Sequence, residues 1–472
     1  MTFSERIGSD LFQDENVTER YDYSYRAVTK LFNNWTIRSG FPCGAVGGLV
    51  FVCFLKYLSD NREWLQIKSS DLYRYNILCS IFPEHVDVAE LAEYVSDVER
   101  QIGFSMGVIA DFASKINHQL VEEAFKEALH IINDIDFSYK DGNGYGLAYE
   151  LLLMEIERQG SNAKQGILVT GVSLAELMSE LLDLKPGMTV YDPAGGFGIL
   201  TAVASAGLPV SVVTKEIVPD IAAVNEMLLI MSGCRNGKVL VADSLSDFNK
   251  DEERKYDRII CDLPVLKKSL AVSKSAWGSN MDGTWHFVFK IFDSLKEGGR
   301  AVIWLPQSYG FRGGYFERNR RFLLEQGVIE AIIQVPDEYV VGSNAKFCMW
   351  VLQKKTGKCD EYNNAVYMLD FTGRGFPMPK DLEAESLFER LVELVRRRYE
   401  IEGFAKNIDV KTIIQNDSTL SISRYMEVPI DVEEFLSQSA SLYDQEEKLE
   451  KELAGLSEAV RAALTEYENS RR

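Results

Sequence analysis

The sequence lacks the cysteine and histidine patterns that build disulfide frameworks and zinc sites. Its seven cysteines are scattered and odd in number, none forms a C-x-x-C pair, and there are only four histidines. Such cysteines are typical of reduced proteins, and no histidine stands at metal-ligand spacing from a cysteine. We therefore predict neither disulfide bonds nor a metal site.

Long apolar runs are also missing. No stretch approaches the roughly 18 apolar residues needed to cross a bilayer. The strongest, residues 45–55, is followed at once by Lys56. The first ten residues carry charges and no apolar core, which is unlike an export signal. We expect a cytoplasmic protein with no membrane segment.

Positive charge is scarce, since 51 Lys and Arg face 71 Asp and Glu, for a net charge of −20. A protein that holds DNA alone usually presents a basic face. The basic clusters here are small, and solvated helix faces explain them more simply than a binding surface does. If DNA is the substrate, a partner is expected to supply most of the grip. The clusters are Arg318, Arg320 and Arg321; Arg396, Arg397 and Arg398; and Lys267 and Lys268.

Residues 1–160 are expected to form a helical domain. Residues 45–65 are apolar on several faces and end in charge, as a buried helix does. Leu91, Val95 and Val98 fall at the three- and four-residue spacing of an amphipathic helix. A turn-rich segment at residues 138–146 breaks the pattern.

After Gln165, short apolar runs alternate with helical stretches. Near-continuous apolar strands separated by helices indicate a parallel sheet that is covered on both faces. We predict a doubly wound α/β (Rossmann-like) core over residues 161–378 with an antiparallel final hairpin, and ligands beyond the carboxyl ends of its strands. The predicted strands span residues 188–192, 209–216, 238–243, 256–262, 300–306, 328–336 and 346–353.

Residues 379–472 read as a charged helical region. Its end has an apolar seam at alternating four- and three-residue steps, which predicts a coiled-coil-like helix that joins subunits. A lone amphipathic helix packed on its own domain is the alternative. The seam consists of Leu442, Leu449, Leu453, Leu456, Val460, Ala463 and Tyr467, with Glu446 as the exception.

The sharpest local feature is the glycine-rich turn in VYDPAGGFGIL, residues 190–200. It follows a strand that ends at Asp192 and opens a helix. Such a turn is shared by dinucleotide and nucleoside binders. Glu216 and Asp243 close the next two strands, where they could reach ribose hydroxyls and an adenine amino group. Three acidic strand ends favour a nucleoside without phosphates, although acidic helix caps would give the same pattern.

Together with its neighbours, this turn resembles the methyl-donor motif of N6-adenine DNA methyltransferases. The closest pattern is that of the modification subunits of type I restriction systems, D-P-[AT]-C-G-[ST]-G-G. Gly195 replaces the cysteine and Phe197 the small hydroxyl residue. The resemblance extends in order through FVCFLKYLSD (51–60), LPQSYGFRGG (305–314) and LSISRYM (420–426). It therefore covers nearly the whole chain.

The resemblance implies an S-adenosylmethionine core, with a specificity subunit and a second modification subunit as partners that bring the chain to DNA. The donor would be held by Thr170, Asp192, Pro193, Ala194, Gly195, Gly196, Gly198, Glu216 and Asp243. The target adenine, flipped out of the duplex, would be held by the turn Asp262, Leu263, Pro264 and Val265.

Two segments depart from the family. The catalytic turn of the family reads Asn/Asp-Pro-Pro-aromatic, whereas Leu263 here lacks the fixed φ of proline and Val265 cannot stack on a base. The donor segment of the family resembles G-x-F/Y-Y/F-T-P, but residues 166–171 retain only its glycine and Thr170. Core packing is the favoured role for the aromatic residues that could compensate, which are Phe197, Trp277, Trp285 and Tyr309.

Three hypotheses follow. The leading one is a site-specific adenine-N6 DNA methyltransferase of the type I modification kind. The second is a catalytically impaired scaffold subunit that assembles with an active modification or specificity subunit. The third is N-methylation of a protein or small molecule on the same fold, which the long helical flanks disfavour.

Overall fold

The computed structural model describes residues 43–68, most of 88–117, 170–246, 253–266, 281–336, 346–355, 364–372 and 387–426, with scattered positions between them. Residues Met1–Tyr425 form one compact unit and Met426–Arg472 a second. Among the described residues, no helix is long and apolar enough to cross a membrane.

A single nine-stranded sheet runs through the first unit in the order β3-β2-β1-β4-β5-β7-β6-β8-β9. Strands β1 to β5 are parallel, whereas β7 runs antiparallel to both of its neighbours. The strands are β1 Thr189–Asp192, β2 Ser211–Glu216, β3 Gly237–Val241, β4 Tyr256–Asp262, β5 Leu295–Pro306, β6 Ile329–Gln334, β7 Phe347–Gln353, β8 Ala365–Asp370 and β9 Ala405–Asp409.

The prediction of a doubly wound core is confirmed strand by strand. All seven predicted strands correspond to β1 to β7, and β6 and β7 form the expected antiparallel pair. The sheet continues beyond residue 378, because β9 pairs antiparallel with β8. Sequence reasoning missed two strands, β8 and β9. It missed β9 since polar residues interrupt it and the charged residues around it suggested helix, whereas β8 is an apolar run like the predicted strands. The division at residue 378 stays a prediction, but the sheet itself extends past it.

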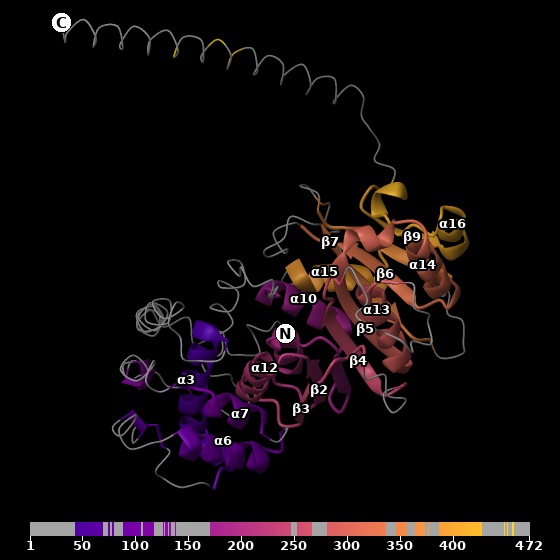
Figure 1. The fold of residues 1–472 in the computed structure, drawn as a ribbon. Coiled ribbons are helices and arrows are strands. Elements are labelled where there is room, and N and C mark those ends of the chain that lie inside the picture. Colours follow the sequence, from indigo (N-terminus) through magenta and orange to yellow (C-terminus); the bar gives the residue numbers. More distant parts are fainter. Residues whose placement is uncertain are drawn as a thin grey trace, which may run out of the picture. The chain divides into compact units, whose positions relative to one another are not determined.

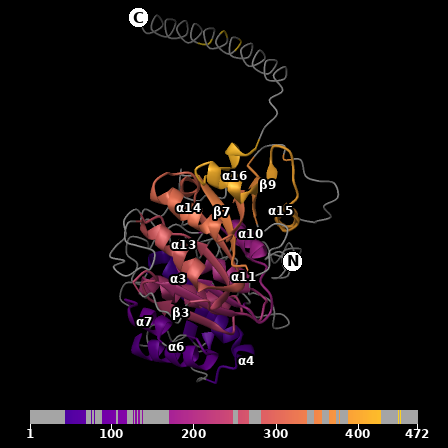
Figure 2. The same ribbon diagram turned by 90° about the vertical axis from the view of Figure 1, so that its right-hand side faces the viewer.

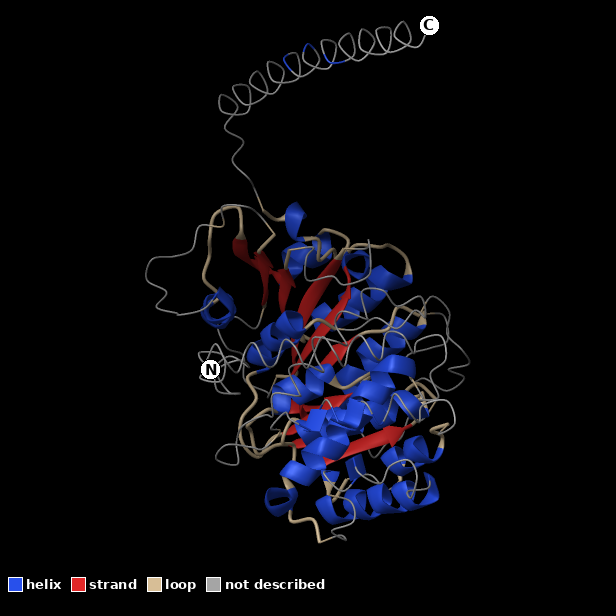
Figure 3. Ribbon diagram, turned by 90° about the vertical axis from the view of Figure 1, so that its left-hand side faces the viewer, coloured by secondary structure: helices blue, strands red, loops and turns tan. Residues whose placement is uncertain are grey.

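Helices cover both faces of the sheet. Figure 2 shows α13 and α14 on one side of the strands and α10 and α11 on the other, and Figure 3 shows the strands between the helical layers. The bounds are α10 Val172–Leu182, α11 Ile199–Ser205, α12 Pro219–Met231, α13 Gly283–Ser294, α14 Tyr315–Glu325, α15 Leu387–Arg397 and α16 Val410–Gln415.

The amino-terminal helices lie at the β3 end of the sheet, beside α12 (Figure 1). They are α3 Gly44–Asp60, α4 Arg62–Leu65, α6 Val88–Ile102 and α7 Val108–Ser114. The expected buried helix over residues 45–65 corresponds to α3 and α4, and Leu91, Val95 and Val98 are fully buried as predicted. The predicted boundary near residue 160 lies outside the described residues.

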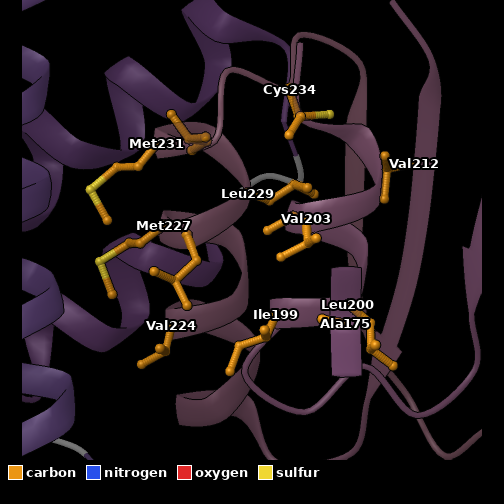
Figure 4. Close-up of a cluster of buried hydrophobic side chains, with 14 of the residues drawn as sticks. Ala175, Ile199, Leu200, Val203, Val212, Val224, Met227, Leu229, Met231 and Cys234 are labelled. Atoms are coloured by element: carbon orange, nitrogen blue, oxygen red, sulfur yellow. The ribbon is translucent and has the colours of Figure 1, made fainter. Parts of the chain in front are cut away.

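Helix α12 is buried from Ile221 to Met231 because it packs on two partners. Met227 and Met231 extend toward the amino-terminal helices, whereas Leu229 faces Val203 and Val212 on the sheet side (Figure 4). This two-sided burial joins the helical region to the core. Two residues separate the start of α12 at Pro219 from the end of β2 at Glu216.

The predicted carboxy-terminal seam lies almost entirely outside the described residues. The structure describes three residues of this region, Lys448, Lys451 and Leu456, and each of them is helical. The coiled coil therefore stays a prediction.

Candidate functional site

The glycine-rich turn joins β1 to α11. The Asp192 carboxylate is buried, and it accepts a hydrogen bond from the Ala194 N–H at 2.9 Å. Gly196 and Gly198 have φ angles of 50° and 84°, the left-handed region that glycine tolerates best. The buried Asp192 carboxylate therefore stabilises the turn through its hydrogen bond to the Ala194 N–H.

Two polar side chains leave no room for a Cβ atom in this turn. At Gly195 a Cβ would overlap Thr214 Oγ1 and lie 2.7 Å from Asn225 Nδ2, and at Gly198 it would lie 2.5 Å from Asn225 Oδ1. Asn225 Nδ2 donates to the Gly196 carbonyl at 3.1 Å and to Thr214 Oγ1 at 3.0 Å. The cysteine of the family pattern therefore does not fit at position 195 of this chain.

Asn225 was missed by sequence reasoning. It is completely buried on α12, in the run IAAVNEMLLIM. The available signal was the pair of polar residues Asn225 and Glu226 within an apolar run, since buried polar groups are retained where they have partners.

Glu216 lies next to the same turn. Its Oε2 accepts a hydrogen bond from the Gly196 N–H at 3.0 Å, and its Oε1 accepts one from the Val218 N–H at 2.8 Å. A carboxylate has about four acceptor positions, so capacity for two further donors remains. Beside it, Ile217 is 62% exposed and Val218 is 42% exposed.

Asp243 completes the expected trio. The residues on either side of it bond to the other two loops: the Ala242 N–H donates to the Glu216 carbonyl at 3.0 Å, and Ser244 Oγ to the Pro193 carbonyl at 2.6 Å. The Asp243 carboxylate accepts from the Leu245 N–H at 2.9 Å. The structure thus brings the ends of β1, β2 and β3 together at one edge of the sheet.

The catalytic turn leaves the same edge. The Leu263 N–H donates to the Trp304 carbonyl of β5 at 2.9 Å, and the Leu263 side chain is buried. The Pro264 carbonyl already accepts from Thr284 Oγ1 at 2.6 Å, whereas Val265 is 40% exposed. The sequence predicts that the 263–264 backbone holds a substrate amine, whereas in the structure the Pro264 carbonyl is bound to Thr284.

Thr170 contacts the catalytic turn directly. Its hydroxyl donates to Asp262 Oδ2 at 2.9 Å. The sequence pattern had grouped Thr170 with the donor residues. The contact ties the segment before α10 to the end of β4.

Burial raises the proton affinity of two aspartates at this edge. It raises the pKa of Asp192 to about 7, against hydrogen bonds from Ala194 and the Cys261 thiol that lower it, while Asp262 and Glu216 raise it further. Burial also raises the pKa of Asp262 to about 6, opposed by Thr170. Since carboxylates repel one another and attract cations, this edge suits a ligand that carries positive charge.

Of the aromatic residues that could compensate in ligand stacking, Trp285 and Tyr309 are buried in the core and are excluded from that role. Phe197 is partly buried and packs on the hydrophobic core. Trp277 lies outside the described residues.

Comparison with known proteins identifies the family of this chain. Residues 140–434 match the family described as N-6 DNA Methylase. The MjaVII methylase subunit, of a type I restriction enzyme from Methanocaldococcus jannaschii, is 23% identical over 442 residues, covering 86% of this chain and 74% of its own length. The MjaVIII methylase subunit from the same organism is 24% identical over 375 residues, covering 71% of this chain. The chain spans only 62% of that relative's length.

Solved structures share the fold. The type I restriction-modification system methyltransferase subunit from Streptococcus thermophilus superposes with a TM-score of 0.67 at 17% identity, covering 87% of this chain and 99% of that one. A chain from a study of complex assembly in the type I R-M system gives 0.62 at 16% identity, with 92% and 98% covered.

The sheet order and the loops at its carboxyl edge define a doubly wound α/β methyltransferase, for which S-adenosylmethionine is the implied cofactor. The chain belongs to the N-6 DNA Methylase family, which matches more than half of its length. Within that family, the relatives named above are methylase subunits of type I restriction enzymes.

Proposed function

We propose that this chain is a modification subunit that transfers a methyl group from S-adenosylmethionine to N6 of adenine in DNA. A partner specificity subunit would select the site. The observation that carries the proposal is the meeting of Glu216, Asp243 and the glycine turn beside the Asp262 turn. The net charge of −20 favours a DNA grip supplied largely by partners.

The residues of the edge fit the donor. Glu216 retains acceptor capacity for two ribose hydroxyls, and the exposed Ile217 beside it offers an apolar face for a purine ring. The Asp243 carboxylate, which accepts from the Leu245 N–H, would also accept from the adenine amino group of the donor. The carboxylates favour the cationic amino acid and sulfonium parts of the donor. Bound there, the donor supplies the methyl group.

The chain's own residues would orient the target amine. Asp262 Oδ and the Leu263 carbonyl would accept its two hydrogen bonds, with Thr170 fixing the Asp262 carboxylate. Preorganised acceptors stabilise charge that develops in the transition state, and positioning beside the donor supplies much of the remaining rate gain.

Calorimetric titration with S-adenosylmethionine tests the donor site. We expect binding, and we expect Glu216→Gln to weaken it about tenfold or more, since hydrogen bonds to a charged acceptor contribute about 1.5–3 kcal/mol. Glu253→Gln is the matched control, because Glu253 is exposed and precedes the amino end of β4. Absence of heat with millimolar donor would reject the enzymatic proposal.

A scaffold subunit without catalysis is the second candidate. It is favoured by the altered turn, where Val265 offers no ring and Leu263 uses its N–H in the sheet. Proline at 263 would remove that donor, so Val265→Phe alone is the cleaner repair. In a complex reconstituted with the specificity subunit, Val265→Phe should raise methylation about tenfold, since base stacking contributes about 1–3 kcal/mol, while Val265→Leu should not. No methylation by either form, despite donor binding, would favour the scaffold.

A further inference from the structure

The amino terminus of α13 holds the catalytic turn. Thr284 Oγ1 donates to the Pro264 carbonyl at 2.6 Å and accepts from the Leu266 N–H at 3.0 Å. The Gly283 N–H donates to the Leu266 carbonyl at 3.1 Å. The backbone on both sides of Val265 is therefore fixed to two consecutive residues of this helix.

The preceding residue, Asp282, holds a second loop. It is buried and caps α13 by accepting from the Trp285 N–H at 3.0 Å. Its other oxygen, Oδ2, accepts from the Tyr309 hydroxyl at 2.9 Å and the Tyr315 hydroxyl at 3.2 Å. Residues 282–284 thus anchor both the turn after β4 and the loop after β5.

A buried arginine fixes that second loop from behind. Arg320, which is 1% exposed, donates to the Tyr309 carbonyl at 3.1 Å, the Arg312 carbonyl at 2.8 Å and the Ser418 carbonyl at 2.7 Å. It belongs to a basic cluster that the sequence suggested was a solvated helix face. The structure shows instead that Arg320 serves as a brace for residues 309–312.

This braced loop presents an aromatic side chain to solvent. Arg320 holds the backbone on either side of Phe311 through the carbonyls of Tyr309 and Arg312. The Phe311 side chain itself is 51% exposed. Arg312 is exposed beside it, in a chain of net charge −20. Exposed aromatic rings next to basic residues are typical of surfaces that stack on unpaired bases.

The loop also leaves the sheet beside the catalytic turn. Asp262 at the end of β4 pairs with Trp304 of β5, and β5 ends two residues later at Pro306, before the short helix Gln307–Gly310. Both loops therefore start at the same edge, on adjacent parallel strands, and share the anchor at residues 282–284.

We infer that Phe311 stacks on the target adenine and supplies the aromatic contact that Val265 cannot make. The inference rests on the proposed adenine methylation. Phe311 is a substrate contact in this scheme, with Asp282 and Arg320 as its positioning residues.

Binding of a fluorescein-labelled single-stranded oligo(dA), measured by anisotropy with saturating S-adenosylmethionine, tests this role on the full chain. We expect Phe311→Leu to weaken binding about five- to a hundredfold and Phe311→Tyr to stay within about twofold of the unmodified chain. Adding Val265→Phe to Phe311→Leu should restore most of the lost affinity. Leucine keeps an apolar side chain, so the leucine and tyrosine variants isolate the ring.

The donor titration separates the two proposals. Unchanged S-adenosylmethionine affinity in Phe311→Leu, together with weaker oligo(dA) binding, supports the inference. Equal oligo(dA) affinity in Phe311→Leu and the unmodified chain overturns it, as does the absence of any oligo(dA) binding by a chain that binds the donor. Failure of the donor itself to bind would refute the proposed function instead. Melting temperatures equal to that of the unmodified chain exclude misfolding of these surface variants.

Discussion

Two buried glutamates lie between the amino-terminal helices and the core, and the raised pKa of Glu226 makes stability depend on pH. Glu99 of α6 accepts from the Ile109 N–H at 2.9 Å and the Ala110 N–H at 3.2 Å. Glu226 of α12 is fully buried, and neither of its oxygens accepts a hydrogen bond from a described residue. A proton on Glu226 lets it donate to Glu99, so burial and the facing carboxylate raise the pKa of Glu226 far above its ordinary 4.5.

The sign of the effect follows from that raised pKa. Below pH 4.5 the Glu226 carboxyl is protonated in both the folded and the unfolded chain, so its titration does not change the unfolding free energy. Above that value the unfolded state loses the proton first, so stability falls as pH rises toward the native pKa. Each pH unit in this window costs about 1.4 kcal/mol of unfolding free energy.

Glu226→Gln removes the titration and keeps an N–H donor for Glu99. Between pH 6 and pH 8, the unfolding free energy of the variant relative to the unmodified chain should rise by about 3 kcal/mol. Urea unfolding at pH 6, 7 and 8, followed by circular dichroism, measures this difference. Glu90→Gln, at an exposed position on α6, is the control. A variant whose advantage does not change with pH would refute this account of the raised pKa of Glu226.

Three further predictions concern the functional edge. Gly195→Ala should weaken S-adenosylmethionine binding about tenfold or more, because its Cβ overlaps Thr214 Oγ1; calorimetry should show partial recovery with Thr214→Ala, and full affinity in the single variant would contradict the crowding. Methylation by the reconstituted complex should fall as pH drops through about 6, where the Asp262 acceptor becomes protonated; Asp262→Asn should flatten that part of the pH profile. Arg320→Leu should lower the unfolding free energy by about 3 kcal/mol, because it orphans buried carbonyls; chemical denaturation with Arg321→Leu as the exposed control measures it.

Strands could be predicted from the sequence because the apolar run that indicates a strand lies within the strand itself. The central strands β1, β4, β5, β6 and β7 are largely buried apolar runs, so each can be recognised from its own residues. The carboxyl edges of parallel strands coincide by geometry, which is why Glu216 and Asp243 could be placed beside the glycine turn. Two strands were not predicted. β9 is short, polar in alternation and defined mainly by its pairing with β8, whereas β8 has an apolar run from which it could have been predicted.

The hydrogen-bond partners of side chains could not be predicted from the spacing of residues in the sequence. Thr170 bonds to Asp262 across 92 positions of sequence, and Arg320 bonds to the Ser418 carbonyl across 98. The residues next to Thr170 and Arg320 in the sequence do not indicate these distant partners. The exposure of Phe311 is similarly a property of the braced loop, since the nearby aromatic residues Tyr309 and Phe316 are buried.

The sequence alone determined the wound sheet, the order of the donor and catalytic motifs, and the residues missing from the catalytic turn. Periodicity and motif identity are written into contiguous stretches of the chain. Only the tertiary structure decided that Asn225 crowds the glycine turn, that the Pro264 carbonyl is occupied, and that α13 anchors two loops at one edge. Those contacts depend on distances between segments far apart in sequence, which packing sets and no local pattern encodes.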